Sequence, residues 1–234
     1  MGTHAGHSCL WYIRKFNFFP TMTDEERMDL AKTAKMVIAK RGETIAWPRD
    51  SSAHAWLVKE GRVRLVRWAE DGRTLATDLV GPGEIIGETA ILTGEGDADA
   101  VEAVEDVILC RVSAEFLRGL CVRNPKLTLH ISKLMGLRKK RIETRLADLL
   151  FCTVKVRIAR LLLQLAERFG SETAGGALLD VRLTHQDIGE LVGANREAAT
   201  RAVLDLKAAG LIAYVGRRIL IKDSDALKRA GGQS

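Results

Sequence analysis

The feature of this sequence that most constrains its fold is a long helical stretch in the middle of the chain. Residues 125–150 contain one proline, at the first position, and one glycine, and their apolar side chains recur at helical spacing. A helix of this length is about 38 Å long at 1.5 Å rise per residue, longer than a small domain needs. It either pairs with a second copy or lies on its own domain, and the absence of an internal stop signal favours pairing. The expected contact residues are Leu127, Ile131, Leu134, Ile142, Leu146 and Leu149, a stripe that Arg138 interrupts.

The part of the chain before this helix has the pattern of a small β-domain. Residues 23–39 begin with a Thr-Asp-Glu-Glu start signal and predict a short helix. From Thr44 to Val112 the sequence changes to short runs of β-branched and aromatic residues, separated by glycine-containing turn signals. Many short strands in succession predict a β-barrel or jelly roll. We therefore expect an α+β protein with a β-domain at 1–123, a dimerisation helix at 124–151 and a third domain at 152–234.

The third domain carries the pattern of two helices that meet at a tight angle. After a helix that ends at Gly170 and a polar loop (SETAGG), residues 183–203 read LTHQDIGELVGANREAATRAV. The small Gly189 suits the point where two helices touch, Gly193 suits the turn, and Ala199 suits an apolar contact on the second helix. These features predict a helix–turn–helix.

The second of these helices exposes polar side chains suited to DNA. Arginine offers a two-pronged donor to guanine, glutamate accepts from cytosine, and asparagine or threonine can hold a base or a phosphate. Residues 211–222 predict two strands joined by Gly216-Arg217-Arg218, a wing with two cations at its tip. A helix pair with a solvated Arg/Glu face is the alternative, which the wing disfavours. The candidate DNA contacts are Asn195, Arg196, Glu197, Thr200, Arg201, Arg217 and Arg218.

Composition excludes several classes of protein. The 234 residues carry a formal net charge of +6, and 47% of them are hydrophobic, as in an ordinary globular protein. There is neither an apolar run of the ~20 residues that span a bilayer nor an apolar leader, so we expect a cytoplasmic protein without a membrane partner. The sequence has no GxxxxGK, HExxH or nucleophile-elbow motif, so we do not expect an enzyme. A ligand-binding subunit without DNA contact is the other class, and the winged helix–turn–helix pattern counts against it.

The order of these domains resembles that of the bacterial cyclic-AMP receptor/FNR-type (CRP/FNR) transcription regulators. The similarity covers about residues 16–222 and is most specific in THQDIGELVGANREAATRAV and in GEIIGE within the β-domain. It implies a homodimer formed through the long helix, with each recognition helix in the major groove of half a palindromic site on double-stranded DNA. It also implies contact with RNA polymerase and an effector bound in a cyclic-nucleotide-binding-like domain or at the dimer interface. The residues that it places on DNA are Arg196, Glu197 and Arg201 at base edges and Thr184 and His185 near the backbone.

The same resemblance bears on the effector. Members that bind cyclic nucleotides hold the ribose hydroxyl with a Gly-Glu pair and the phosphate with a later Arg-Ser/Thr pair. This chain keeps Gly87, Glu88, Thr89 and Ala90 but has Asp97 and Ala98 at the arginine pair, where a phosphate would meet like charge. Cyclic-AMP-responsive members also present a Thr-Ser pair on the long helix, where this chain has Ile142-Glu143. The sequence therefore predicts an effector other than cyclic AMP, and an atypical cyclic-nucleotide pocket is an alternative.

Metal-containing sensors of the same family suggest two cofactors. An FNR-type iron–sulfur cluster needs four cysteine ligands, and Cys9 with Cys110 cannot supply them, so we do not expect a cluster. Haem needs only one or two axial ligands and stays open as a cofactor. Its candidate ligands are His54 and His130, besides His4, His7 and Cys9 in the N-terminal segment.

The distribution of charge suggests a regulator that needs no diffusible effector. Residues 83–106 carry eight acidic and no basic side chains, whereas residues 138–141 are all basic. If these segments lie close together, their pairing could hold the unliganded dimer in a DNA-binding state. Redox sensing through a thiol such as Cys121 or Cys152 is a further hypothesis, which the cysteine spacing does not support.

Overall fold

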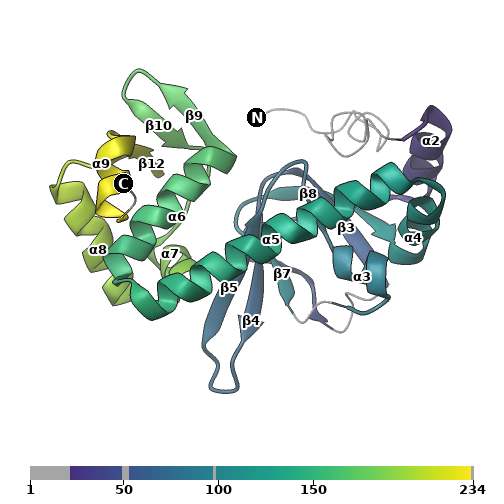
Figure 1. The fold of residues 1–234 in the computed structure, drawn as a ribbon, viewed down its shortest axis with the longest axis horizontal. Helices are drawn as coiled ribbons and strands as arrows, with labels where there is room; N and C mark the ends of the chain where they lie inside the picture. The colour runs from purple at the N-terminus through teal and green to yellow at the C-terminus, as the bar shows by residue number, and fades with distance from the viewer. Residues whose placement is uncertain (1–21, 49–52, 97–98, 233–234) are drawn as a thin grey trace. The chain divides into compact units, whose positions relative to one another are not determined.

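The long helix predicted from the sequence is present. The computed structural model describes residues 22–48, 53–96 and 99–232. Helix α5 (Pro125–Phe151) runs unbroken for 27 residues (Figure 1). The chain separates into two compact units, and the division falls inside α5. The first unit ends at Lys139 and excludes Trp68–Asp78, which belongs with Lys140 and everything after it in the second unit.

Two four-stranded sheets form the framework of the β-domain. One has the order β1-β8-β3-β6 and the other the order β2-β7-β4-β5. No hydrogen-bonded strand pair joins the two sheets in the described ranges, so the predicted barrel is an open, jelly-roll-like pair of sheets. The strands are β1 (Lys35–Ala39), β2 (Thr44–Ala46), β3 (His54–Glu60), β4 (Val63–Trp68), β5 (Thr74–Val80), β6 (Ile85–Ile86), β7 (Ala100–Ala103) and β8 (Val107–Ser113).

The strands β3 and β8 are buried on both faces. Successive residues of a strand point to opposite sides, and those of β3 alternate between two apolar clusters. Leu57 joins the cluster that the helices cover, whereas Trp56 and Val58 join the second cluster. The helices that contribute to the first cluster are α2 (Asp24–Thr33), α3 (Glu88–Thr93), α4 (Ala114–Arg123) and the start of α5.

One prediction about this unit is wrong in part. The helix predicted over residues 23–39 has the expected capping box at Thr23 but ends at Thr33, and β1 follows, paired antiparallel with β8. A strand at a sheet edge takes its hydrogen bonds from a partner distant in sequence, which local spacing does not reveal. The acidic segment, for which the sequence predicted no element, forms α3 and β7.

The second unit contains a helical bundle and a four-stranded sheet. Its strands are arranged in the order β11-β12-β10-β9. The loop predicted at residues 171–176 is instead largely the β9–β10 hairpin, which widens the predicted two-stranded wing into a sheet. The elements are α6 (Val154–Phe169), β9 (Gly170–Thr173), β10 (Gly176–Leu179), α7 (His185–Val192), α8 (Arg196–Ala208), β11 (Ile212–Val215), β12 (Arg218–Ile221) and α9 (Ser224–Ala230).

The tip of the β4–β5 hairpin belongs to this second unit through a specific contact. The hydroxyl of Thr74 on β5 donates to Oε1 of Glu190 on α7 at 2.9 Å. Glu190 also accepts a hydrogen bond from Gln186 at 2.7 Å, so its buried carboxylate is held from two sides. None of the helices in the described ranges is both long enough and apolar enough to cross a membrane.

Candidate nucleic-acid interface and effector region

Helices α7 and α8 form the helix–turn–helix that the sequence predicts. Gly189 lies where the turn folds back on α7, and a Cβ there would be 2.7 Å from the carbonyl oxygen of Ala194. No side chain fits at that distance, which explains the glycine. Gly193 has a φ of +64°, a left-handed conformation that glycine adopts most readily, and it ends α7.

Side-chain caps define where both helices begin. Thr184 and Asp187 form a capping box at α7, in which Thr184 Oγ1 accepts from the Asp187 amide at 3.1 Å. Asn195 caps α8, with Oδ1 accepting from the Ala198 amide at 2.8 Å. Two predicted DNA contacts therefore already hold helix termini. Both residues are exposed, so a phosphate that approaches either helix N-terminus would lie beside them.

The first two turns of α8 present a polar surface. Arg196, Glu197 and Arg201 are all exposed, as the sequence predicts. Their side chains differ in charge and hydrogen-bonding pattern, which is the requirement for distinguishing base edges.

His185 and Thr200, in contrast, are engaged within the unit. His185 Nδ1 lies 2.9 Å from Thr200 Oγ1, and His185 Nε2 lies 3.1 Å from the hydroxyl of Tyr214. The Thr200 hydroxyl also donates to the carbonyl of Arg196 at 2.8 Å. These bonds link α7, α8 and β11, so both residues position the polar face of α8.

The predicted wing has one exposed cation at its turn. Arg217 is exposed beside Gly216. Arg218 is the first residue of β12, and its Nη1 lies 2.9 Å from Oδ1 of Asp180. Arg218 is therefore paired with Asp180, whereas Arg217 is the exposed cation at the turn. Sequence reasoning also missed the exposed Arg182, which comes two residues before the α7 cap.

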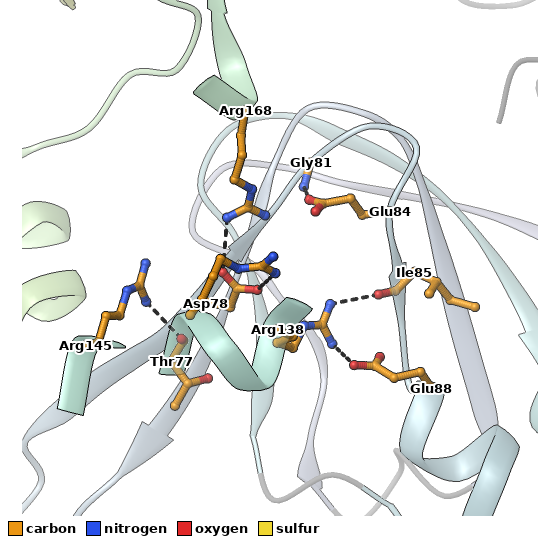
Figure 2. Close-up of polar contacts among 10 residues, drawn as sticks. Thr77, Asp78, Gly81, Glu84, Ile85, Glu88, Arg138, Arg145 and Arg168 are labelled. Atoms are coloured by element: carbon orange, nitrogen blue, oxygen red, sulfur yellow. Dashed lines mark hydrogen bonds and ion pairs between the residues drawn. The ribbon is translucent and has the colours of Figure 1, made fainter. Parts of the chain in front are cut away.

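Gly87 and Glu88, the Gly-Glu pair of the predicted effector motif, lie at the start of α3. Gly87 has a φ of +85°, and a Cβ there would be 2.8 Å from the carbonyl oxygen of His54. Glu88 follows with a side chain only 6% exposed, and its carboxylate is ion-paired with Arg138 of α5. Figure 2 shows Arg138 reaching both this carboxylate and the carbonyl of Ile85, to which Nη2 donates at 2.9 Å.

Sequence reasoning suggested that the basic run containing Arg138 pairs with the acidic segment, but it did not place Arg138 against Glu88 of the effector motif. The available signal was a lone arginine inside the apolar stripe of α5. The other predicted pocket residues are less informative. Thr89 is half-buried, Ala90 is packed in the apolar cluster, and Asp97 and Ala98 lie outside the described residues. Ile142 is exposed and belongs to the second unit.

The acidic segment pairs with arginines on strand β4 and immediately before it. The neighbouring strands β4 and β7 are antiparallel, which aligns their side chains. Glu88 pairs with Arg138 of the predicted basic run. The charge hypothesis thus holds for the contact between Glu88 and Arg138, and its consequence for the unliganded dimer stays a prediction. The pairs are Arg62, just before β4, with Glu105, and Arg64 and Arg67 of β4 with Glu102 and Asp99, at 2.6, 2.9 and 2.8 Å.

The candidate cofactor ligands lie in separate elements. His54 begins β3, with its ring centroid 6.3 Å from that of Trp56, and His130 lies on α5. Partial burial, with a smaller effect of Lys133, lowers the pKa of His130. No group of three or more His, Cys, Asp or Glu side chains suited to a metal ion occurs among the described residues.

The cysteines differ in how accessible they are. Cys110 and Cys121 are buried and Cys152 is half-buried, and none of these three forms a disulfide. Burial raises the pKa of the Cys121 thiol, and a hydrogen bond from Thr128 opposes the shift only in part. A raised pKa reduces the thiolate fraction, so Cys121 is poorly suited to redox sensing.

The apolar stripe of α5 divides into two halves. Leu127 and Ile131 are fully buried in the first unit's own core, and Leu134 packs against that core. The expectation that Leu127 and Ile131 contact a second chain is therefore wrong, because the β-domain already covers them, whereas the contact predicted for the half-buried Leu134 stays a prediction. The exposed apolar residues of α5 are Ile142, Leu146 and Leu149, as predicted, together with Leu129, Leu137, Leu150 and Phe151.

Comparison with known proteins identifies the family. Residues 36–124 match the cyclic nucleotide-binding domain, and residues 156–230 match the Crp-like helix-turn-helix domain. The chain is 30% identical over 200 residues to the CRP-like cAMP-activated global transcriptional regulator of Mycobacterium tuberculosis, which covers 86% of this chain and 89% of the relative. The chain belongs to the CRP/FNR family. Among other CRP/FNR relatives, the global nitrogen regulator of Synechococcus elongatus is 29% identical, covering 81% of this chain and 86% of the relative.

The fold agrees with that of solved structures in the CRP/FNR family. FixK2 from Bradyrhizobium japonicum has a TM-score of 0.77 at 21% identity and covers 86% of this chain and 98% of its own. Membership means that α7 and α8 are the DNA-binding helix–turn–helix of a transcription regulator, and that the paired sheets are a domain of the cyclic nucleotide-binding type.

Proposed function

We propose that this protein is a homodimer that binds a palindromic double-stranded DNA site through α8 and responds to a small-molecule effector in its β-domain. The observation that carries the DNA part is the exposed trio Arg196, Glu197 and Arg201 on the first two turns of α8. The Asn195 cap and the hydrogen bond between His185 and Thr200 hold this face in place before DNA binds. A preorganised face loses little side-chain entropy on binding.

The contacts divide by chemistry. Arg196, Glu197 and Arg201 contact base edges, whereas Thr184 and Arg217 contact phosphates. RNA polymerase is a further partner that we infer from family membership alone.

The dimer is proposed to form through the C-terminal half of α5. Ile142, Leu146 and Leu149 follow i, i+4, i+7 spacing and are exposed. An exposed apolar stripe of this spacing on a long helix is typical of a coiled-coil partner surface.

The DNA proposal is tested by selecting the operator from a random pool and measuring binding of variants. We expect Arg196→Ala and Arg201→Ala to lose specific binding while the protein stays folded. The matched control is Arg229→Ala, an equally exposed arginine on α9, which should bind as wild type. Full operator affinity in both α8 variants would refute the role of this face.

The effector is proposed to be a molecule other than cyclic AMP. Support comes from Asp97 and Ala98 at the position of the phosphate-binding pair, and from Arg138, which already occupies the carboxylate of Glu88. The similarity to a cAMP-activated relative favours the alternative of an atypical cyclic-nucleotide pocket. Calorimetry of the purified protein with cyclic AMP decides between them, since saturable micromolar binding would overturn our proposal. An absorbance spectrum of the same sample tests haem, which would give a Soret band.

A further inference from the structure

Tyr214 on strand β11 begins a chain of hydrogen bonds that ends on helix α8. Its hydroxyl oxygen lies 3.1 Å from Nε2 of His185, the first residue of α7. Nδ1 of the same imidazole lies 2.9 Å from Oγ1 of Thr200 on α8. The Thr200 hydroxyl in turn donates to the carbonyl oxygen of Arg196 at 2.8 Å. Three side chains therefore join the wing to the first turn of α8.

The chemistry of these groups determines the direction of each hydrogen bond. A threonine hydroxyl has one proton, and Thr200 donates it to the Arg196 carbonyl, so Thr200 Oγ1 accepts from Nδ1 of His185. When this imidazole is neutral, its only proton is then on Nδ1, and Nε2 accepts from the Tyr214 hydroxyl. Burial raises the pKa of Tyr214, so the hydroxyl keeps the proton that it donates. Every hydrogen bond of the chain thus runs from β11 toward α8.

The ring of Tyr214 contacts the opposite end of α8. Nζ of Lys207, in the last turn of that helix, lies 5.8 Å from the centroid of the Tyr214 ring, which is within the range of a cation–π contact. The hydroxyl and the ring of one residue are therefore connected to the two ends of a 13-residue helix. A helix held at one point can pivot about that point, whereas a helix held at both ends cannot, so Tyr214 restricts the tilt of α8 against β11.

We propose that Tyr214 is a positioning residue for base recognition by α8. The inference rests on the proposed function, in which Arg196 contacts a base edge. The chain ends on the backbone carbonyl of Arg196 itself, so it restrains the residue whose guanidinium must be aligned with the base. A guanidinium distinguishes guanine only when both of its donors face the acceptors of that base. Loss of the chain should therefore lower discrimination between base pairs more than total affinity, a large share of which comes from phosphate contacts.

Tyr214 acts through its neighbours and not by contact with DNA. Its single hydroxyl proton is donated to His185, so none is left to donate to a phosphate oxygen. A phosphate contact would contribute equally to binding of every DNA sequence, whereas a positioning residue contributes only where bases are read. The two roles are thus separated by comparing operator DNA with random DNA.

The test measures the affinity of the full-length protein for the selected operator and for random DNA of equal length, by anisotropy. Tyr214→Phe removes one oxygen atom and should lower the ratio of the two affinities about three- to tenfold, the effect of one lost hydrogen bond, while affinity for random DNA stays within twofold. Thr200→Val interrupts the same chain and should give the same loss, and Thr200→Ser, which retains the hydroxyl, should recover most of it. The double variant Tyr214→Phe/Thr200→Val should lose no more than either single variant.

The matched control is Thr173→Val. It removes a hydroxyl that donates to the Gly176 carbonyl at 2.7 Å on the β9–β10 hairpin of the same sheet, so the affinity ratio should not change. An equal loss on operator and random DNA would overturn the proposal, because Tyr214 would then be a phosphate contact. An unchanged ratio in Tyr214→Phe, even with a lower thermal midpoint, would reduce the chain to a structural role. Additive losses in the double variant would also contradict a single chain.

Arg201→Ala separates this proposal from the one on which it rests. If the wild-type protein prefers no selected sequence, or if Arg201→Ala keeps the full preference, base recognition by α8 is wrong and the positioning role falls with it. If Arg201→Ala loses the preference and Tyr214→Phe does not, the positioning role alone is wrong.

Discussion

Replacing Arg138 with methionine should destabilise the first unit by removing one partner of a shielded ion pair. The Glu88 side chain is 6% exposed and the Arg138 side chain 14% exposed, so water screens their attraction poorly. Methionine preserves much of the apolar stem of arginine but leaves the Glu88 carboxylate buried without its cation. The carbonyl of Ile85 also loses the hydrogen bond from Arg138.

Removing one member of a buried ion pair costs about 3–5 kcal/mol, far more than the pair contributes in net terms. With an m-value of about 2 kcal/mol/M, that loss lowers the urea midpoint by about 1.5–2.5 M. The double variant that also carries Glu88→Gln should recover most of the loss, because it removes the stranded charge.

Urea unfolding followed by tryptophan fluorescence is the assay, since Trp56 is buried within this unit on β3. The matched control is Lys40→Met, which breaks an ion pair with Asp106 that is exposed on both sides and should leave the midpoint unchanged. A single variant within about 1 kcal/mol of wild type would contradict the reasoning. A double variant as unstable as the single one would do so as well, because the cost would then not be electrostatic.

Four further outcomes are expected. Arg201→Ala should lose about 1–3 kcal/mol of discrimination at one base pair in anisotropy titrations, and unchanged base preference would remove Arg201 from the base contacts. Leu146→Asp places a charge at a position that is 58% exposed in the single chain, and sedimentation should show a monomer; a persisting dimer would place the interface elsewhere. Gly189→Ala should lower the thermal midpoint although alanine is the better helix former, because its Cβ would meet a backbone oxygen at 2.7 Å, and a raised midpoint would refute this packing. Iodoacetamide should label Cys152 before Cys121 by mass spectrometry, because burial raises the pKa of the Cys121 thiol, and the reverse order would show that this thiol is accessible.

The sequence predicted those features of the fold that depend on residues close to one another along the chain. The caps at Thr184 and Asn195, the glycine at the helix contact and the extent of α5 all follow from interactions within a few positions of the chain. Residues 35–39 show where this fails, because their strand exists only through pairing with β8. The apolar stripe of α5 is a second example. Its spacing predicts that Leu127 and Leu146 lie on one face of the helix, but it does not show that the β-domain covers Leu127 and leaves Leu146 exposed.

The sequence alone determined that the chain carries a helix–turn–helix after a long helix and a β-domain, because periodicity and caps are local properties. Only the tertiary structure decided the partner of each charge. Glu88 meets Arg138 across 50 positions, and Asp78 meets Arg168 across 90. The acidic segment that stands out in a basic chain pairs with arginines on the adjacent strand β4 and just before it. Coulomb attraction depends on distance in space and on exclusion of water, and neither can be read from the order of residues.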